Sequence, residues 1–412
     1  MSAQGQGRDF EAIDARLDLT RAAIDLSEVG WIKRVNEPAS GVLRYARDAD
    51  GRTTTSGDIK SDGLELTGEV FMRPDNGLER ATIERIYSRD RMDLRGSLLK
   101  DTQGRYTVDV SGPLLNASGW IDGLLDFGAS ASASGRPASG PDAGVSIAVD
   151  DLILREDASL KNAQIVLEAE QGEVIKALVA GSITDSKGLE ATMETDEDQR
   201  VVSLRADDAG WVIRVLTKTD YLLGGIMNLT GRFGKDVGSA ELRLNDVRLK
   251  NAPLLAQVFS LASLQGLTDV LSGEGVLFSE INAPLRFREG RVDFLGARAS
   301  GPALGLTLRG WMGLSSGELG LDGVVVPSFG VNSALGGIPI IGDLFVSRQG
   351  EGVFAVVYSV SGNLERARVA INPLSAVTPG FLRRIMENPS RPPPEFDDNL
   401  QDAVPEDVGS VE

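Results

Sequence analysis

Residues 59–70, IKSDGLELTGEV, carry the pattern that decides the fold. Leu64, Leu66 and Val70 fall on alternate positions after the turn pair Asp62-Gly63, and Ile59 lies before it. A period of two is typical of a β-strand with one apolar face, and Asp-Gly pairs form tight hairpin turns. This stretch therefore predicts two antiparallel strands joined by a turn.

The same pattern recurs along the chain. It begins with Leu17, Leu19, Ile24 and Leu26, and further turn pairs are Asp50-Gly51, Asn76-Gly77, Glu289-Gly290 and Asp322-Gly323. If most of the chain is strand, roughly 25 strands about 4.8 Å apart would give a sheet on the order of 120 Å long, which must curl. We expect a mainly β fold, a long curled antiparallel sheet forming an apolar groove (a β-taco), with a few short amphipathic helices.

Three segments interrupt the pattern. Residues 128–144 are rich in Gly, Ser and Ala and predict a linker or long loop, and residues 387–412 are rich in Pro and acids and predict a disordered tail. A β-rich groove segment over 1–127 and a second β-groove region over 145–386 are then expected on either side of the linker. Two short helices are predicted at Ser118 to Leu125 and Ala209 to Leu216.

The third interruption is the uncharged stretch 251–268, NAPLLAQVFSLASLQGLT. Its apolar residues recur at helical spacing, Asn251 is a candidate N-cap, and Pro253 fits a first helical turn. The stretch, extended to 252–271, predicts a helical insert. Two interpretations stay open: a helix that covers the end of a sheet, and a helix that touches lipid or closes an apolar groove. Its polar residues argue against a transmembrane span.

Composition excludes several classes of function. The chain of 412 residues has no Cys and no His, so thiolate nucleophiles, His-based triads and the usual zinc and iron–sulfur sites are excluded, and no cofactor or metal is predicted. Its formal net charge of −18 opposes binding to nucleic acid and to anionic membrane surfaces. We expect no nucleic-acid partner and no catalytic residue.

Several short stretches match catalytic or ligand-binding motifs, but the residues around them do not support those functions. Residues 313–317 match a serine nucleophile elbow without a histidine base, and residues 350–355 match a dinucleotide motif but lead into a strand-like run. Residues 48–51 lack the remaining ligands of a calcium loop and predict a hairpin turn. The adjacent pairs Asp150-Asp151 and Asp207-Asp208 point to opposite sides of a strand, so neither pair can flank one glycosidic bond.

No targeting or membrane-spanning segment is evident. Residues 1–10, MSAQGQGRDF, lack the basic and apolar regions of a signal peptide, and no apolar run reaches 18 residues.

Residues 206–384 resemble the C-terminal region of AsmA-like proteins of Gram-negative envelopes, of the YhdP type found in α-proteobacteria. The pieces that carry the resemblance are ADDAGWVIRVL (206–216), GGIMNLTG (224–231), APLLAQVFSLASLQGLTDVLSGEGVLFSEI (252–281), GPALGLTLRGWMGL (301–314), VVVPSFGVNSALGGIPIIGDLF (324–345) and GVFAVVYSVSGNLERARVAINPLSAVTPGFLRRI (352–385). The resemblance is weaker before residue 206. It implies a β-groove protein anchored in the inner membrane that reaches across the periplasm and helps to move phospholipid to the outer membrane. Family members are usually longer and carry an N-terminal transmembrane helix, so an upstream anchor-bearing polypeptide is an expected partner.

The resemblance and the strand pattern together predict a lipid-transport module, on the periplasmic side of the envelope and membrane-associated, whose groove shields phospholipid acyl chains. Two alternatives stay open, a structural envelope-assembly factor that binds proteins through exposed strand edges and a polysaccharide-active enzyme on a β-solenoid. Candidate lipid or membrane contacts are Leu254, Leu255, Val258, Phe259, Leu261, Leu264, Leu267, Val270 and Leu271. Candidate groove-lining residues are Val324, Val326, Val353, Ala355 and Val357.

Overall fold

The computed structural model describes residues 2–6, 9–26, 31–119, 121, 140–197, 199–235, 237–261, 265–288, 290–314, 316–327, 356–363 and 366–372. The predicted tail 387–412 lies outside the described residues, as do the dinucleotide-like motif at 350–355 and most of the predicted linker. The predicted helix at 118–125 falls largely outside them as well.

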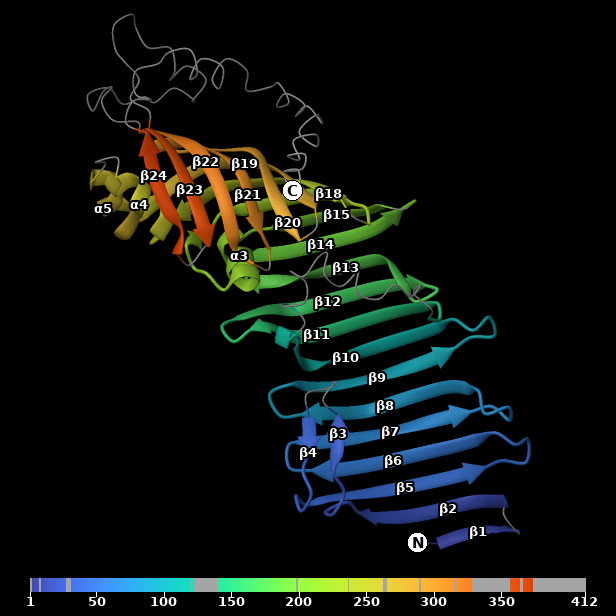
Figure 1. The fold of residues 1–412 in the computed structure, drawn as a ribbon. Helices are drawn as coiled ribbons and strands as arrows, with labels where there is room; N and C mark the ends of the chain where they lie inside the picture. The colour runs from blue at the N-terminus through green and yellow to red at the C-terminus, as the bar shows by residue number, and fades with distance from the viewer. Residues whose placement is uncertain are drawn as a thin grey trace, which may run out of the picture.

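One long sheet dominates the described chain (Figure 1). Its strands in the first half are β1 (Ser2–Gln6), β2 (Asp9–Asp18), β5 (Ala39–Arg47), β6 (Thr53–Ser61), β7 (Leu64–Met72), β8 (Leu78–Ser88), β9 (Met92–Lys100), β10 (Tyr106–Asn116), β11 (Ala143–Arg155) and β12 (Ala158–Glu170). Those in the second half are β13 (Glu173–Thr184), β14 (Lys187–Asp196), β15 (Gln199–Ala206), β16 (Leu222–Leu223), β17 (Ile226–Phe233), β18 (Val237–Leu249), β19 (Val276–Arg288), β20 (Arg291–Ser300), β21 (Leu304–Gly313), β22 (Glu318–Pro327), β23 (Val356–Asn363) and β24 (Arg368–Asn372). The predicted mainly β fold with one long antiparallel sheet is confirmed.

Neighbours in the sheet are neighbours in sequence. Each strand pairs with the next one along the chain, except that β3 and β4 are absent from the sheet and short β16 lies along β18. Among the described residues β1 pairs only with β2, and β24 pairs only with β23, so in this part of the chain the sheet is open and β1 and β24 are its edge strands.

One pair of strands breaks the antiparallel order. Tyr106 of β10 pairs with Ala143 of β11, and Asn116 pairs with Ile153, so β10 and β11 run parallel. A parallel pair needs a connection that returns the chain to the starting end of the strand. Residues 117–142 make that return.

The hairpin turns follow the sequence signals, with one exception. Gly51, Gly63 and Gly290 have φ angles of 81°, 74° and 72°, which L side chains rarely adopt, and each lies in the turn between two paired strands. The turn predicted at Asp322-Gly323 is wrong, because both residues lie inside β22. Gly323 serves close packing instead, since a Cβ there would lie 2.0 Å from the carbonyl oxygen of Thr307.

The insert predicted at 252–271 forms two helices, α4 (Pro253–Leu261) and α5 (Gln265–Ser272). Pro253 begins α4, as expected for a residue that needs no N–H partner. Asn251 is not the N-cap: its φ is 51°, whereas an N-cap is extended, and its N–H donates to Leu271 O at 3.1 Å.

Helix α3 (Ala209–Thr217) matches the predicted helix at 209–216 to within one residue. Asp208 caps it by accepting a hydrogen bond from the Trp211 N–H at 2.9 Å, and Lys218 ends it in the left-handed conformation. Trp211, Val212 and Val215 are buried against the sheet residues of the main core.

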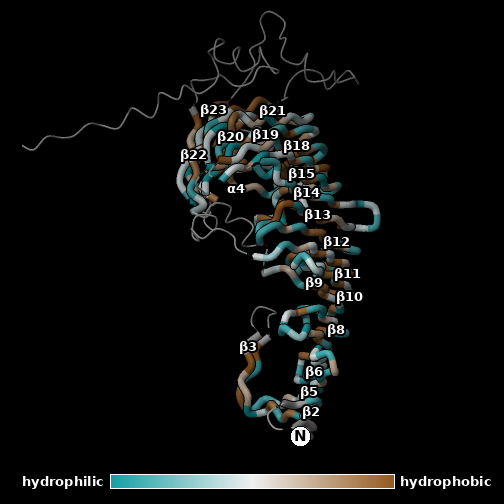
Figure 2. The backbone as a smooth tube through the Cα atoms, turned by 90° about the vertical axis from the view of Figure 1, so that its right-hand side faces the viewer, coloured by the Kyte–Doolittle hydropathy of each residue, from teal (hydrophilic) through white to brown (hydrophobic). Residues whose placement is uncertain are grey.

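The sheet curls at its C-terminal end. In Figure 2, β22 and β23 lie across from β15 and β18, and α4 lies between them. Leu255, Val258 and Phe259 of α4 share one buried cluster with Phe278, Val325 and other sheet residues. Hairpin β3 (Ile24–Leu26) and β4 (Trp31–Lys33) stands apart from β5–β8, on the side toward which the sheet curls (Figures 1 and 2).

Candidate functional site: the apolar inner face

Apolar residues that pair directly across neighbouring strands form one continuous row along most of the sheet. Directly paired residues share a face, so the partners can be followed from strand to strand. The central row runs from β2 to β19 through Ala15, Leu43, Gly57, Gly68, Ile83, Gly96, Val110, Ile147, Ile165, Val179, Ala191, Leu204, Leu229, Leu242 and Ala283. At about 4.8 Å per strand, this row is on the order of 65 Å long.

A second row lies two residues away on every strand and therefore on the same face. It consists of Ile13, Tyr45, Thr55, Val70, Ala81, Leu98, Val108, Val145, Leu167, Ala177, Met193, Val202, Gly231, Ala240 and Leu285. Neither row contains a charged residue. We call the face that carries both rows the inner face.

The residues between the two rows point to the opposite, outer face, and most of them are polar. They are Asp14, Arg44, Ser56, Glu69, Thr82, Ser97, Asp109, Ser146, Val166, Leu178, Thr192, Ser203, Thr230, Glu241 and Pro284. The two faces of one sheet therefore differ in polarity over fifteen strands.

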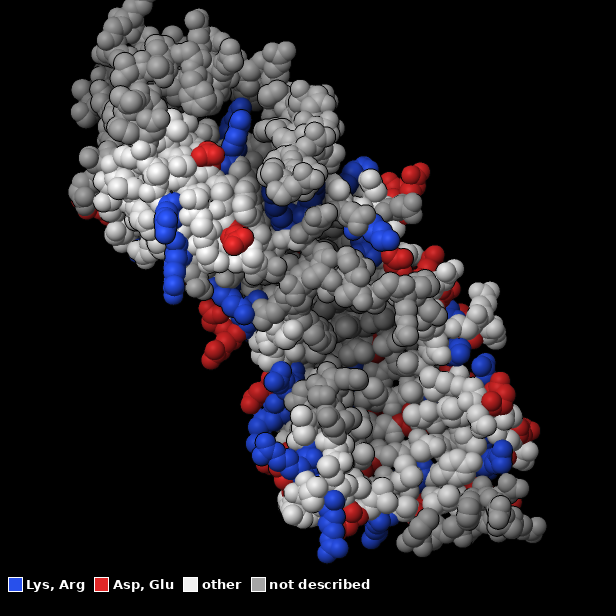
Figure 3. Space-filling model, in the orientation of Figure 1, with Lys and Arg blue, Asp and Glu red and all other residues white. Residues whose placement is uncertain are grey.

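Exposure changes along the central row. Leu43 and Ile83 are more than a third exposed, Val110 to Leu242 are half-buried, and Ala283 is buried. In Figure 3, charged side chains gather mainly along the two margins of the lower half, and the surface between them is mostly uncharged. The central row is thus most exposed at Leu43 and Ile83, whereas its two end residues, Ala15 and Ala283, are buried.

The predicted lipid-contact residues of helices α4 and α5 lie partly in the core and partly on the surface. Leu255, Val258, Phe259 and Leu271 are buried, Leu254 is half-buried, and Leu261 and Val270 are 49% and 42% exposed. Leu264 and the side chain of Leu267 lie outside the described residues. The exposed pair leaves a small apolar surface on the helices.

The predicted groove-lining residues fall on the other face of β22 and β23. Val324 pairs with Val357, and Val326 lies two residues from Val324, so all three share a face. The inner rows instead continue through Leu321, Val325 and Val360, one residue out of phase with the predicted set. Val353 and Ala355 lie outside the described residues. The sequence could not fix this phase, because residues 324–326 are three consecutive valines.

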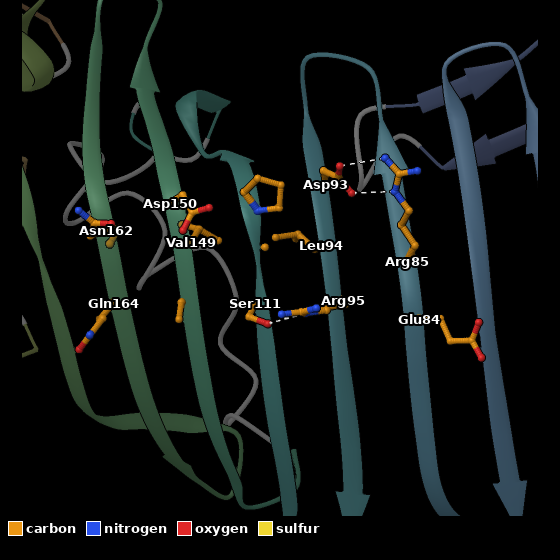
Figure 4. A pocket seen from close by; sticks show the side chains of 14 residues that line it. Glu84, Arg85, Asp93, Leu94, Arg95, Ser111, Val149, Asp150, Asn162 and Gln164 are labelled. Carbon is orange, nitrogen blue, oxygen red and sulfur yellow. Dashed lines mark hydrogen bonds and ion pairs between the residues drawn. The ribbon is translucent and has the colours of Figure 1, made fainter.

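A depression of about 680 Å³ lies on the outer face over β8–β12 (Figure 4). Arg95, Ser111 and Gln164 line it, and β-bulges in β8 and β10 interrupt the strand pairing beside it. The Arg85 guanidinium donates two hydrogen bonds to Asp93 at 2.9 Å and one to Glu65 at 2.8 Å. The hydrogen bond from Arg85 holds the pKa of Asp93 below its ordinary value.

Three of the four paired acids found in the sequence make structural contacts, and the fourth, Asp150, lines the depression. Asp207 accepts the Gly188 N–H at 3.0 Å, Asp208 caps α3 and binds Lys187 at 2.7 Å, and Asp151 binds Lys161. The predicted turn at 48–51 is confirmed, because the Asp48 N–H donates to Arg52 O and its carboxylate accepts from Asp50 and Arg52. Within the described ranges no group of three acidic side chains could hold a metal ion.

The residues of the two inner rows are the candidate site residues that the sequence analysis did not identify. Period-two alternation signals that each strand has an apolar face, but the rows exist only once the pairing register is known. None of the helices in the described part of the chain is long and apolar enough to cross a membrane.

The comparison with known families bears on the second half of the chain. Residues 190–369 match the family model described as YhdP protein, which covers β15 to β23 and helices α3 to α5. No curated protein matches the chain. Residues 190–369 therefore form an AsmA-like region of the YhdP type.

Proposed function

We propose that this chain is an envelope lipid-transport module whose inner face shields phospholipid acyl chains between the inner and outer membranes. The observation that carries the proposal is the pair of uncharged rows, which continue across fifteen strands while the outer face stays polar. Burying each CH₂ group is worth about 0.8 kcal/mol, so an acyl chain gains several kcal/mol by leaving water for such a surface.

The charged side chains along the two margins of the sheet suit the polar head group of a phospholipid. Head groups can stay in water at the strand ends, where charged side chains gather in Figure 3, while the chains lie on the rows. The same surface repeats from strand to strand, so a lipid can shift along the sheet without losing apolar contact. Transfer of this kind needs no catalytic residue and no cofactor, and we propose a non-enzymatic role.

The proposed location is the periplasmic side of the envelope, in peripheral contact with a membrane. Leu261 and Val270, on α4 and α5, are the proposed contacts, since both are exposed apolar side chains. An upstream anchor-bearing polypeptide is the proposed protein partner.

The free sheet edges favour a second candidate function. In the described chain β1 and β24 each pair on one side only. An unpaired edge can add a strand from another protein, so an assembly role through edge pairing is the alternative.

The test compares two neighbouring residues that face opposite ways. Ile165 belongs to the central row, and Val166 belongs to the outer face and is exposed. We expect phospholipid to co-purify with the protein without detergent, and Ile165→Asp to lower the lipid-to-protein ratio severalfold by mass spectrometry, whereas Val166→Asp leaves it unchanged. Absence of phospholipid from the unmodified protein, or equal loss in both variants, would reject the lipid role. Loss of partner-protein binding after strand-edge changes would favour the assembly role instead.

A further inference from the structure

Strands β17–β21 carry a net positive charge, whereas the whole chain carries a net negative charge. The full sequence carries 42 basic and 60 acidic residues. These five strands contain eight arginines, no lysine and four acidic residues. The positive charge is therefore concentrated in one part of an acidic protein.

The strand register puts five of these arginines on the outer face. Arg232 and Arg286 both lie opposite Ser239, and Arg243 and Arg298 both lie opposite Asn282. Arg309 of β21 lies on the same face, two residues from Thr307, which pairs with Arg298. The five residues Arg232, Arg243, Arg286, Arg298 and Arg309, all exposed, form what we call the arginine patch.

The patch spans a short distance. Arg232 and Arg286 are two strands apart, which corresponds to about 10 Å, and the two pairs are offset by four residues, or about 13 Å. The patch is therefore small enough for its side chains to contact one surface together, even on a curved sheet.

Two nearby carboxylates already bind arginines, one of which is the patch residue Arg243, and Asp322 lies opposite Arg309 on the neighbouring strand. Asp293 binds Arg288 at 2.9 Å and Arg291 at 2.6 Å, and Glu241 binds Arg243 at 2.7 Å. Within the described residues Arg232, Arg286 and Arg309 have no ion pair. The positive charge of these three residues is thus available to a partner.

We propose that the arginine patch docks this protein on a membrane surface that contains anionic phospholipid. Arginine presents a planar fork of N–H donors that fits phosphate oxygens, whereas lysine is a point charge. The excess of acids elsewhere does not cancel the patch, because the Debye length is about 10 Å at 0.1 M salt and more distant charges are screened. This surface lies on the face opposite the proposed acyl-chain rows, so docking and lipid loading use different residues and can fail independently.

The experiment is vesicle flotation of the intact chain. The patch variant is Arg232→Gln/Arg286→Gln/Arg309→Gln, and the matched control is Arg16→Gln/Arg21→Gln/Arg47→Gln, which removes the same charge from exposed positions at the N-terminal end. Vesicles are made of phosphatidylcholine alone or with one third phosphatidylglycerol, and circular dichroism melting verifies that both variants fold.

We expect the unmodified chain and the control to bind the phosphatidylglycerol vesicles at low salt and to lose binding at high salt. The patch variant should show a partition coefficient lower by roughly tenfold or more, since each basic residue near an anionic surface adds to membrane binding. Its co-purified lipid content should stay unchanged. Equal binding to both vesicle types, no binding of the unmodified chain, or equal loss in the control variant would overturn the proposal.

Discussion

Ile147 of β11 lies directly opposite Ile165 of β12 on the inner face, in the middle of the central row. Both side chains are half-buried and pack against the main core, yet neither is sealed from solvent. Most residues of the central row are partly buried in the same way, so their side chains pack against neighbours and still present some apolar surface to solvent. The pair is therefore the natural place to monitor occupation of the inner face.

The absence of cysteine makes that measurement direct. An environment-sensitive fluorophore attached to Ile165→Cys should shift its emission to shorter wavelength when phospholipid is added, because lipid displaces water from the row. The same label on Gln164→Cys, which points to the outer face, should not respond. Equal shifts at both sites would mean that lipid does not select the inner face.

The two parts of α4 should respond differently to a charge. Val258 is 2% exposed and packs in the core, so Val258→Asp should lower the free energy of unfolding by several kcal/mol and can prevent folding. Leu261 is half exposed, so Leu261→Asp should fold normally. Circular dichroism melting distinguishes the two.

The Leu261→Asp variant also tests membrane contact by the helices. We expect weaker vesicle association, because the change removes apolar contact and adds negative charge. Intact folding with unchanged association and unchanged uptake of a fluorescent phospholipid would reject a lipid-contact role for Leu261.

Asp293 should make stability depend on pH. Burial alone would raise the pKa of Asp293, but hydrogen bonds from Arg288 and Arg291 outweigh it and hold that pKa below its ordinary value. A carboxylate whose pKa is depressed in the folded state stabilises the protein above its unfolded pKa of about 4, and this contribution is lost as the pH falls through the native value. Asp293→Asn should therefore cost about 1–3 kcal/mol at neutral pH and progressively less below about pH 4. Exposed Glu280→Gln is the control, and a pH-independent cost for Asp293→Asn in urea unfolding would contradict this assignment.

Lys33 should hold hairpin β3–β4 in place. Its buried ammonium donates to the carbonyl oxygens of Thr20, Ala22 and Arg34 at 3.1, 2.7 and 3.0 Å. Lys33→Met removes the ammonium that joins these three carbonyl oxygens, although Thr20 O and Arg34 O still accept the N–H groups of Asn36 and Glu37. We therefore expect faster amide hydrogen exchange in residues 20–26 and 31–34 and little change in the main sheet. Lys60→Met, at an exposed position, should leave the exchange unchanged. Equal protection in both variants would show that Lys33 does not fix the hairpin.

The sequence predicted the strands well because alternation and turn chemistry are local properties. Asp62-Gly63 forms its turn, and the expectation of roughly 25 strands compares with 24 in the described residues. Asp322-Gly323 carries the same local signal but lies within β22, where Tyr358 and Thr307 pack closely around Gly323. Tertiary packing overrode a turn preference at that position.

The remaining differences involve contacts between distant residues. Nothing in the alternation of β10 and β11 indicates strand direction, so their parallel pairing could not be predicted. The side of α4 that would be buried was also undetermined, since Val258 and Leu261 belong to the same helical stripe. The difference between them arises from tertiary packing, because α4 packs against β24 and α5 and only Val258 joins the buried cluster. The inner rows required the register of every pair.

The neighbour-to-neighbour order of the sheet has a consequence for unfolding. From β5 to β9 each strand pairs only with the strands before and after it, as in a linear array of repeats. The stability of such an array is approximately a sum of local unit and interface terms, and cooperativity decays with distance along it. The N-terminal hairpins, which lack the helices that bind the C-terminal strands together, should fray first and in succession, so thermal unfolding should be gradual there and steep at the curled end.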